Sequence, residues 1–187
     1  MDYIYKKINY SNRNELTSEL INQMYSIDKI FYTSKKVYVE VIKDYLRSKK
    51  YNFYFVINTK DNHLVGSAFG EITKNNSFFL DKLFINPKDQ KKLFGTKLLL
   101  RVISDLRVNH KITTISMLPR PITKKINRRI TGNELLKIKI DGEIKEIKRQ
   151  FKSYFKYTLH HHPNIPNMDI IKIEKNKKQK PILNKRR

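Results

Sequence analysis

The sequence predicts one α/β domain with a mixed, mostly antiparallel central sheet that is flanked by helices. Strand-like apolar runs follow one another between turn residues, and runs with apolar residues at helical spacing lie before and after them. The length of 187 residues is enough for one domain with a substantial core.

The chain opens on a predicted strand and two predicted helices. Residues 2–8 alternate well enough for a strand. The first helix covers 13–31, with Ser11 or Asn12 available as its cap, and the second covers 35–50. The apolar positions at helical spacing are Leu16, Leu20, Met24 and Ile27 in the first segment, and Val37, Val41, Ile42 and Tyr45 or Leu46 in the second.

Three strand-like runs follow, at 52–58, 63–73 and 77–85. The turn-forming stretches TKDN and KNN separate them. Apolar runs that are punctuated by short turns favour an antiparallel meander.

After Pro87 the apolar period becomes helical. A helix is predicted from Asp89, and 111–118 is predicted as a strand that ends at Pro119 and Pro121. The inward positions of the helix are Leu93, Leu98 or Leu99, Val102, Ile103 and Leu106.

The last third of the chain is more polar. A basic insert covers about 119–142 and contains a strand-like run before Asp141 and Gly142. Residues 143–159 predict an amphipathic helix, because apolar residues recur on one face, and 168–174 predict a last strand.

Positive charge is concentrated in the second half. Of the net charge of +23, residues 1–100 carry 17 Lys and Arg against 10 Asp and Glu, and residues 101–187 carry 23 against 7. Such a field attracts polyanions, nucleic acid above all, but a chain rich in Lys, Asn and Ile can also carry this charge as solvated surface. We expect one domain over 1–174 and a basic, disordered tail over 175–187.

Several classes of protein are excluded by composition. The absence of cysteine excludes a disulfide framework, a thiolate zinc site and a cysteine nucleophile. The first ten residues lack the apolar core of a signal peptide, and no window approaches the roughly 18 apolar residues of a membrane span, so we expect a soluble, cytoplasmic protein. The three histidines of LHHHP (159–163) lack a carboxylate partner, and we expect no metal site.

The segment 83–103, LFINPKDQKKLFGTKLLLRVI, runs from a strand through Pro87 into a helix. A helix start leaves several backbone N–H groups unpaired and carries the positive end of the helix dipole, so it binds phosphate. Amides from Gln90 to Thr96 that point at one spot could hold a pyrophosphate, and Lys91 and Lys92 would add positive charge.

This segment resembles the cofactor-binding segment of the GCN5-related N-acetyltransferase (GNAT) superfamily. The matching residues are Leu80, Leu83, Ile85, Pro87, Gln90 and Gly95, followed by TKLLLRVI. The element order over 1–118 also matches, so the resemblance covers nearly two-thirds of the chain. Leu93 stands where glycine is usual, and its β-carbon could obstruct the phosphates if the backbone there needs a positive φ.

The resemblance implies that acetyl-CoA is the co-substrate. It implies that the strand before the loop splays from its neighbour, and that backbone groups of this strand pair with the pantetheine arm and polarise the thioester carbonyl. The cofactor-binding residues that it implies are Leu83, Phe84, Ile85, Gln90, Lys91, Lys92, Leu93, Phe94, Gly95 and Thr96.

Acetyl transfer by direct attack needs a base for the amine and an acid for the thiolate. Members of the family often use a carboxylate from the central strands and a tyrosine from the late helix. Asp81, which shares strand parity with Leu83, and Glu71 are the candidate bases, although both can also be solvent-facing strand ends. Tyr154 is the first candidate acid and Tyr157 the second, although a tyrosine on an amphipathic helix is more often part of the core.

The leading hypothesis is therefore an N-acetyltransferase that moves an acetyl group from acetyl-CoA to a primary amine on a small molecule or a protein. The alternative is a nucleic-acid-binding protein on a GNAT-like scaffold with reduced or lost acetyl transfer, which Leu93 and the C-terminal charge favour. The basic insert could bind an acidic acceptor or nucleic-acid phosphate, or be a solvated loop. Its basic residues between Pro119 and Ile130 are Arg120, Lys124, Lys125, Arg128 and Arg129.

Overall fold

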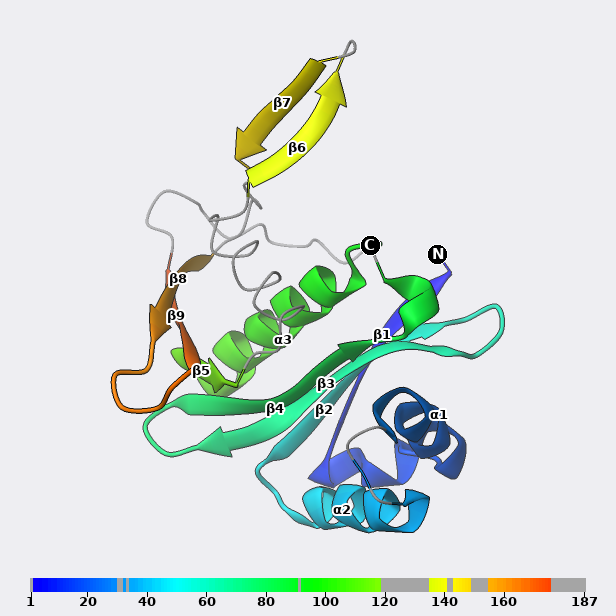
Figure 1. The fold of residues 1–187 in the computed structure, drawn as a ribbon. Coiled ribbons are helices and arrows are strands. Elements are labelled where there is room, and N and C mark those ends of the chain that lie inside the picture. Colours follow the sequence, from blue (N-terminus) through cyan, green and yellow to red (C-terminus); the bar gives the residue numbers. More distant parts are fainter. Residues whose placement is uncertain are drawn as a thin grey trace, which may run out of the picture.

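A seven-stranded sheet in the order β1-β2-β3-β4-β5-β9-β8 forms the centre of the molecule, with α1 and α2 on one face and α3 on the other (Figure 1). The computed structural model describes residues 2–29, 32, 34–90, 92–118, 135–140, 143–148 and 155–175. The elements are β1 (Tyr3–Asn9), a 3-10 helix η1 (Tyr10–Glu15), α1 (Ser18–Asp28), α2 (Lys35–Arg47), β2 (Tyr51–Asn58), β3 (Leu64–Thr73), β4 (Ser77–Ile85), a 3-10 helix η3 (Pro87–Asp89), α3 (Phe94–His110), β5 (Thr114–Met117), β6 (Leu135–Ile140), β7 (Glu143–Lys148), β8 (Phe155–His161) and β9 (Asp169–Lys175).

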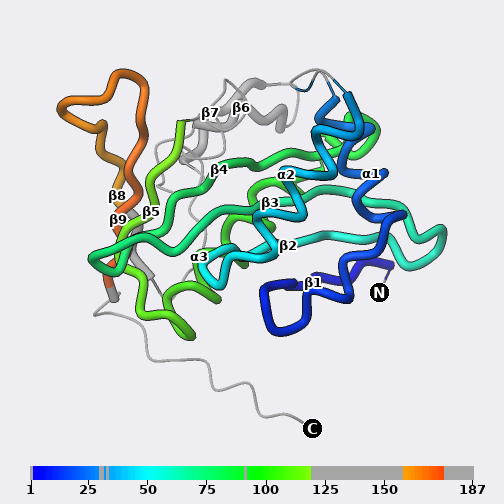
Figure 2. The backbone as a smooth tube through the Cα atoms, turned by 90° about the horizontal axis from the view of Figure 1, so that it is seen from below, coloured from blue at the N-terminus to red at the C-terminus, as the bar shows by residue number. Residues whose placement is uncertain are grey.

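The sheet is mixed and mostly antiparallel, as predicted. Strands β1 to β4 pair antiparallel in chain order, and β2 to β4 form the predicted meander. β4 pairs in parallel with β5, and β9 pairs antiparallel with both β5 and β8. Figure 2 shows β1 at one edge of the sheet and β8 and β9 towards the other.

Two apolar cores lie on the two faces of the sheet. On one face, the predicted inward side of α3 packs on the central strands, and Leu98, Val102 and Leu106 are completely buried. On the other face, Met24 of α1 and Ile42 of α2 pack on aromatic residues of β2 and β3. Because helices cover both faces, the interior of β2 is buried throughout, which explains its continuous apolar run. None of the helices in the described ranges is long and apolar enough to span a bilayer.

The first predicted helix begins later than expected. Thr17 accepts a hydrogen bond from the N–H of Leu20 and caps α1, so the predicted cap at Ser11 or Asn12 is wrong. The reason is that Asn9 caps the 3-10 helix η1 further upstream, so Ser11 and Asn12 lie inside η1.

The predicted helix over 143–159 is wrong. β7 pairs with β6 in a separate two-stranded sheet, and β8 pairs with β9 at the edge of the main sheet. Ile144 and Ile147 are spaced as in a helix. However, charged and apolar residues alternate in the two runs on either side of Asp141-Gly142, and the two runs pair as strands.

The last strand is confirmed as β9. Residues 119–134 of the predicted insert and the predicted tail from 176 lie outside the described residues. The division of the chain into a domain and a tail therefore stays a prediction.

Candidate functional site

β4 is the strand around which the candidate site is built. From Ser77 to Leu80 it pairs with β3 on one edge and with β5 on the other. Beyond Leu80 it continues to Ile85 and remains paired with β3, but β5 ends at Met117. In the part of the chain that the structure describes, no strand pairs with the second edge of residues 81–85. Among the described residues, the pairing of β4 with β5 therefore ends at Leu80 and Met117, and the rest of β4 forms an edge, here called the open edge. The splaying that the resemblance implied stays a prediction.

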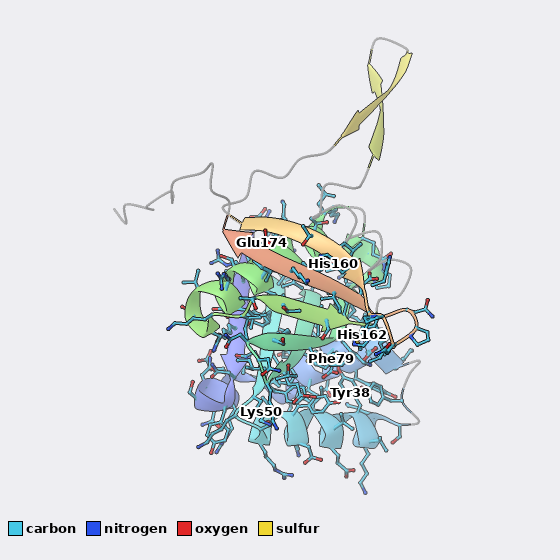
Figure 3. All side chains as sticks on the ribbon, turned by 90° about the vertical axis from the view of Figure 1, so that its left-hand side faces the viewer. Tyr38, Lys50, Phe79, His160, His162 and Glu174 are labelled. Atoms are coloured by element: carbon cyan, nitrogen blue, oxygen red, sulfur yellow. The ribbon has the colours of Figure 1, made fainter. Side chains whose placement is uncertain are left out.

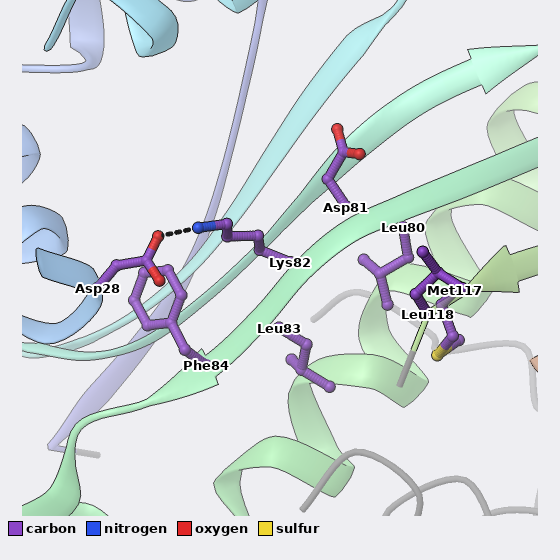
Figure 4. A pocket seen from close by; sticks show the side chains of 8 residues that line it. All are labelled: Asp28, Leu80, Asp81, Lys82, Leu83, Phe84, Met117 and Leu118. Carbon is purple, nitrogen blue, oxygen red and sulfur yellow. Dashed lines mark hydrogen bonds and ion pairs between the residues drawn. The ribbon is translucent and has the colours of Figure 1, made fainter. Parts of the chain in front are cut away.

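A β-bulge at Asp81 lies where the open edge begins. Two successive residues of β3 face Leu80 and Lys82, so Asp81 is the extra residue on β4. The bulge interrupts the alternation of side chains. Asp81 and Lys82 both lie on the side of α1 and α2, and Leu80 and Leu83 lie on the side of α3 (Figure 4). The parity argument that grouped Asp81 with Leu83 is therefore wrong, because an apolar pattern does not reveal a bulge.

A small cleft that is partly open to solvent lies beside this edge. One wall is apolar and comes from β4 and the end of β5, and the other wall carries charged side chains from β4 and α1. The lining residues are Asp28, Leu80, Asp81, Lys82, Leu83, Phe84, Met117 and Leu118. Such a cleft suits a ligand with an apolar arm and a few polar groups.

The charged wall contains a buried ion pair. Asp28, at the end of α1, is 3% exposed and accepts a hydrogen bond from Lys82 Nζ (Figure 4). Lys82 also lies over the ring of Tyr32, with its Nζ 4.5 Å from the ring centroid. A buried carboxylate is costly without a hydrogen-bonded partner, and this pair joins α1 to β4 beside the cleft.

Asp81 is the candidate base that lines the cleft. Its Oδ2 accepts a hydrogen bond of 2.8 Å from the hydroxyl of Tyr51, whose ring stacks on Tyr45 with 4.1 Å between centroids. Burial raises the pKa of Asp81, and the charge of Glu71 adds to this rise. The bond from Tyr51 and the charge of Lys82 oppose it without cancelling it. A carboxyl with a raised pKa is suited to accept a proton near neutral pH.

Glu71, the other candidate base, lies opposite Tyr51 on the neighbouring strand and is not among the residues that line the cleft. Burial and contact with Asp81 raise the pKa of Tyr51, and Glu71 adds to the rise. The structure thus brings both predicted carboxyls to one polar cluster, but only Asp81 to the cleft. Sequence reasoning missed Tyr51, Asp28 and Lys82, because their partners lie on other elements and no local motif signals them.

The open edge of β4 presents backbone groups of alternate residues. Asn86 donates its backbone N–H to a carbonyl of β3 at 2.8 Å, so by alternation Phe84 also points its backbone groups to β3. Those of Leu83 and Ile85 then point to the open edge. The side-chain amide of Gln90 donates to the Ile85 carbonyl at 3.4 Å. Of the three residues predicted to bind the pantetheine arm through the backbone, Leu83 is the one best placed to do so.

The start of α3 lies next along the chain. Leu93 is its N-cap residue with a φ of 64°, the left-handed conformation that favours glycine. Its side chain makes no cap, so the first amides of the helix, at Phe94 and Gly95, have no intrahelical partner. The Phe94 ring is 7% exposed and packs on Tyr3, with 4.7 Å between centroids. Phe94 therefore offers a ligand only its backbone.

The loop before α3 carries the other predicted phosphate ligands. Lys92 Nζ lies 3.2 Å from Asp89 Oδ1, and its side chain is 55% exposed. Thr96 is buried in the first turn of α3, and Lys91 lies outside the described residues. The charge of Lys92 is therefore shared with Asp89.

The two tyrosines predicted as the acid are not on a helix that the structure describes. Tyr154 lies outside the described residues, and Tyr157 is on β8, opposite Ile173 of β9. Both were chosen because the expected late helix carried them, and strand pairing removes that basis for Tyr157. The role of either tyrosine stays a prediction.

The three adjacent histidines each have a local partner. His160 Nε2 lies 3.2 Å from Thr158 Oγ1, and His161 Nδ1 lies 3.2 Å from Asp169 Oδ1. The expectation that the histidines lack a carboxylate partner is therefore wrong for His161, because the pairing of β8 with β9 brings Asp169 beside it. His162 Nδ1 accepts backbone N–H groups of the β8–β9 turn, and Figure 3 shows His160 and His162 well separated. No group of three potential metal ligands occurs among the residues whose positions the structure gives.

Solved structures similar to this one share its fold. No protein-family model and no curated protein matches the chain. A variant of the spermidine N-acetyltransferase SpeG from Vibrio cholerae is 13% identical over 79% of this chain and 91% of its own, with a TM-score of 0.55. A GNAT-family protein from Desulfovibrio desulfuricans is 14% identical over 91% of this chain and 96% of its own, with a TM-score of 0.54. The enzyme AAC(6')-Iy, solved with a bisubstrate analogue that contains CoA, is 12% identical over 68% of this chain and 88% of its own, with a TM-score of 0.52. These likenesses confirm the predicted GNAT fold.

Proposed function

From this GNAT fold we propose that the chain transfers an acetyl group from acetyl-CoA to a primary amine. The observation that carries the proposal is the open edge of β4 beside Asp81. One cleft combines a strand edge without a partner strand among the described residues, for an acyl donor, with a carboxyl of raised pKa for the proton of an amine. The proposal rests on this site rather than on the fold, because proteins with the same fold can have different functions.

Two sets of backbone groups fit the polar parts of the donor. The Leu83 N–H at the open edge would donate to the thioester carbonyl and stabilise the negative charge that develops on its oxygen. The amides of Phe94 and Gly95 would bind the pyrophosphate, and Lys91 and Lys92 would add charge. The CoA-containing analogue in the structure of AAC(6')-Iy supports this choice of donor.

Asp81 would serve as the base. It would accept a proton from the ammonium of the acceptor, and the freed nitrogen would form a bond to the acetyl carbon while the carbon–sulfur bond breaks. The thiolate leaves with the electron pair and takes up a proton, for which Tyr154 and Tyr157 remain the candidate donors, and the new amide nitrogen loses its remaining excess proton to solvent. The negative charge of Asp81 also gives a cationic amine a local partner on a protein whose net charge is +23.

Calorimetric titration of CoA and acetyl-CoA into the nucleic-acid-free protein tests the donor site. We expect micromolar binding that is lost when Lys91 and Lys92 are both changed to Glu. The matched control changes Lys35 and Lys36 to Glu, an equal charge change at the start of α2, and should leave binding unchanged. No binding by the unaltered protein, or equal loss in both double variants, would contradict the proposal.

Nucleic-acid binding is the second candidate function, and the excess of positive charge after residue 100 favours it. Truncation after Glu174 separates the two. Loss of RNA and DNA binding with unchanged CoA affinity would make nucleic-acid binding an accessory of the transferase. A chain that never binds CoA but binds nucleic acid with steep salt dependence would favour the second function.

A further inference from the structure

His63 connects the turn between β2 and β3 to the loop before α3. Its Nε2 lies 2.9 Å from Asp89 Oδ2, and its Nδ1 lies 2.6 Å from Asp61 Oδ1. Carboxylate oxygens only accept hydrogen bonds, so a ring nitrogen that carries a proton donates it to the carboxylate that it faces. The imidazole thereby bridges a carboxylate of its own turn and a carboxylate 26 residues further along the chain.

Asp89 is an unusual neighbour for an anion site. It is 3% exposed and lies four residues before Leu93, the N-cap of α3. Burial by itself would raise the pKa of Asp89, but the bonds from His63 and Lys92 outweigh it, and the pKa is lowered. Asp89 is therefore held as a carboxylate close to the helix start where phosphates would bind. Without a partner, its charge would oppose phosphate binding.

Hydrogen bonds also connect the backbone before Asp89 to the start of β3. Asn86 donates its backbone N–H to Val65 at 2.8 Å and its side-chain amide to the Leu64 carbonyl at 3.3 Å. Asp89 donates its own N–H to the Asn86 carbonyl at 2.9 Å. These bonds hold the first part of the loop against β3. Two described side-chain contacts join the start of β3 to this loop, Asn86 with Leu64 and His63 with Asp89. The contact of His63 lies closer to α3 in the sequence.

We propose that His63 is a positioning residue for the CoA site. Resting on the proposed function, this assigns His63 one effect: its hydrogen bond holds the Asp89 carboxylate towards the β2–β3 turn, beside the start of α3. The loop then presents its amides to the phosphates in one arrangement. His63 acts only through Asp89 and touches neither the acetyl group nor the acceptor.

Two substitutions of His63 separate the two ring nitrogens. In His63→Gln, the amide nitrogen lies as many bonds from the backbone as Nε2 and can still donate to Asp89. In His63→Asn, the amide nitrogen takes the place of Nδ1 and can donate only to Asp61. Calorimetric titration with CoA should give a dissociation constant within about twofold of the unaltered protein for His63→Gln and about tenfold weaker for His63→Asn. Thermal unfolding of each variant establishes that it is folded.

A double-mutant cycle distinguishes positioning through Asp89 from a merely structural role. In an Asp89→Asn background the carboxylate charge is gone, so adding His63→Asn should change CoA affinity by less than about twofold. A full tenfold loss in that background, or equal affinities of the two His63 variants, would overturn the inference. Failure of the unaltered protein to bind CoA would instead overturn the proposed function on which the inference rests.

Discussion

The two halves of β4 have the same strand geometry but different surroundings. From Ser77 to Leu80 the strand pairs on both edges, and Phe78 and Leu80 are almost completely buried. After the bulge at Asp81, the strand has a pairing partner on one edge only among the described residues, and the side chains from Asp81 to Phe84 are half-buried.

This difference shows how one strand supports both the sheet and a site. A ladder that is closed on both edges uses all its backbone groups, and it contributes to stability but offers a ligand nothing. An open edge keeps unpaired groups and is a liability unless it is protected. Here a cleft lined by Asp81 and Lys82 occupies that position. We therefore expect substitutions in the closed half to cost stability and substitutions in the open half to cost binding or activity.

The largest effect is expected at the two glycines of β3. A β-carbon at Gly70, opposite the closed half, would lie 2.0 Å from the Phe79 carbonyl oxygen. Gly70→Ala should lower the free energy of unfolding by about 3 kcal/mol or more, as measured by urea denaturation. At Gly66, opposite Ile85 in the open half, a β-carbon would lie 2.4 Å from the tip of the Ile85 side chain and 2.8 Å from the Phe84 carbonyl oxygen. Gly66→Ala should cost less, because no described strand on the other edge keeps this half of β4 from shifting. Equal losses would show that the open half is as rigid as the closed half.

Two leucines of β4 provide the next comparison. Leu80 is 2% exposed in the closed half, and Leu83 is half-buried in the open half. Leu80→Ala should cost about 2.5 kcal/mol of unfolding free energy and Leu83→Ala about 1 kcal/mol. Calorimetry with CoA should show the reverse order of effects on affinity. A larger stability loss for Leu83→Ala would break the comparison.

Asp81→Asn should separate activity from stability. We expect the rate of thiol release from acetyl-CoA, with an acceptor found by amine screening, to fall about 100-fold. The folded-state pKa of Asp81 is raised above its unfolded value of about 3.9, so ionisation of this group costs stability as the pH rises from that value through the folded-state pKa.

The variant should therefore be at least as stable as the unaltered protein at pH 7, and the difference should vanish below about pH 4. Urea denaturation at both pH values measures this. A destabilised variant with normal turnover would make Asp81 a structural residue of the bulge.

The smallest effect is expected at Leu93, where the open site continues into α3. Leu93→Gly removes the β-carbon from a left-handed position and should tighten CoA binding about fivefold, which corresponds to about 1 kcal/mol. Leu93→Ala keeps the β-carbon and should give no gain. Equal affinities of the two variants would mean that the β-carbon does not obstruct the phosphates.

Local sequence patterns were sufficient for most of the fold up to β5. Turn residues between short apolar runs predicted the meander, and the change of period after Pro87 predicted α3. The positive φ that was considered at Leu93 is present. These features depend on neighbours in the chain, so a linear pattern contains them.

Contacts between distant residues decided the rest. The bulge that turns Asp81 away from Leu83 arises from register with β3. The bond of Tyr51 with Asp81, and that of Lys82 with Asp28, join different elements. The segment predicted as a late helix instead forms two strands, because it finds partners in β6 and β9. The sequence by itself therefore determined the order of most elements and the loop before α3. Only tertiary packing decided which side chains meet at the cleft, because register, bulges and cross-strand partners are set by the whole sheet.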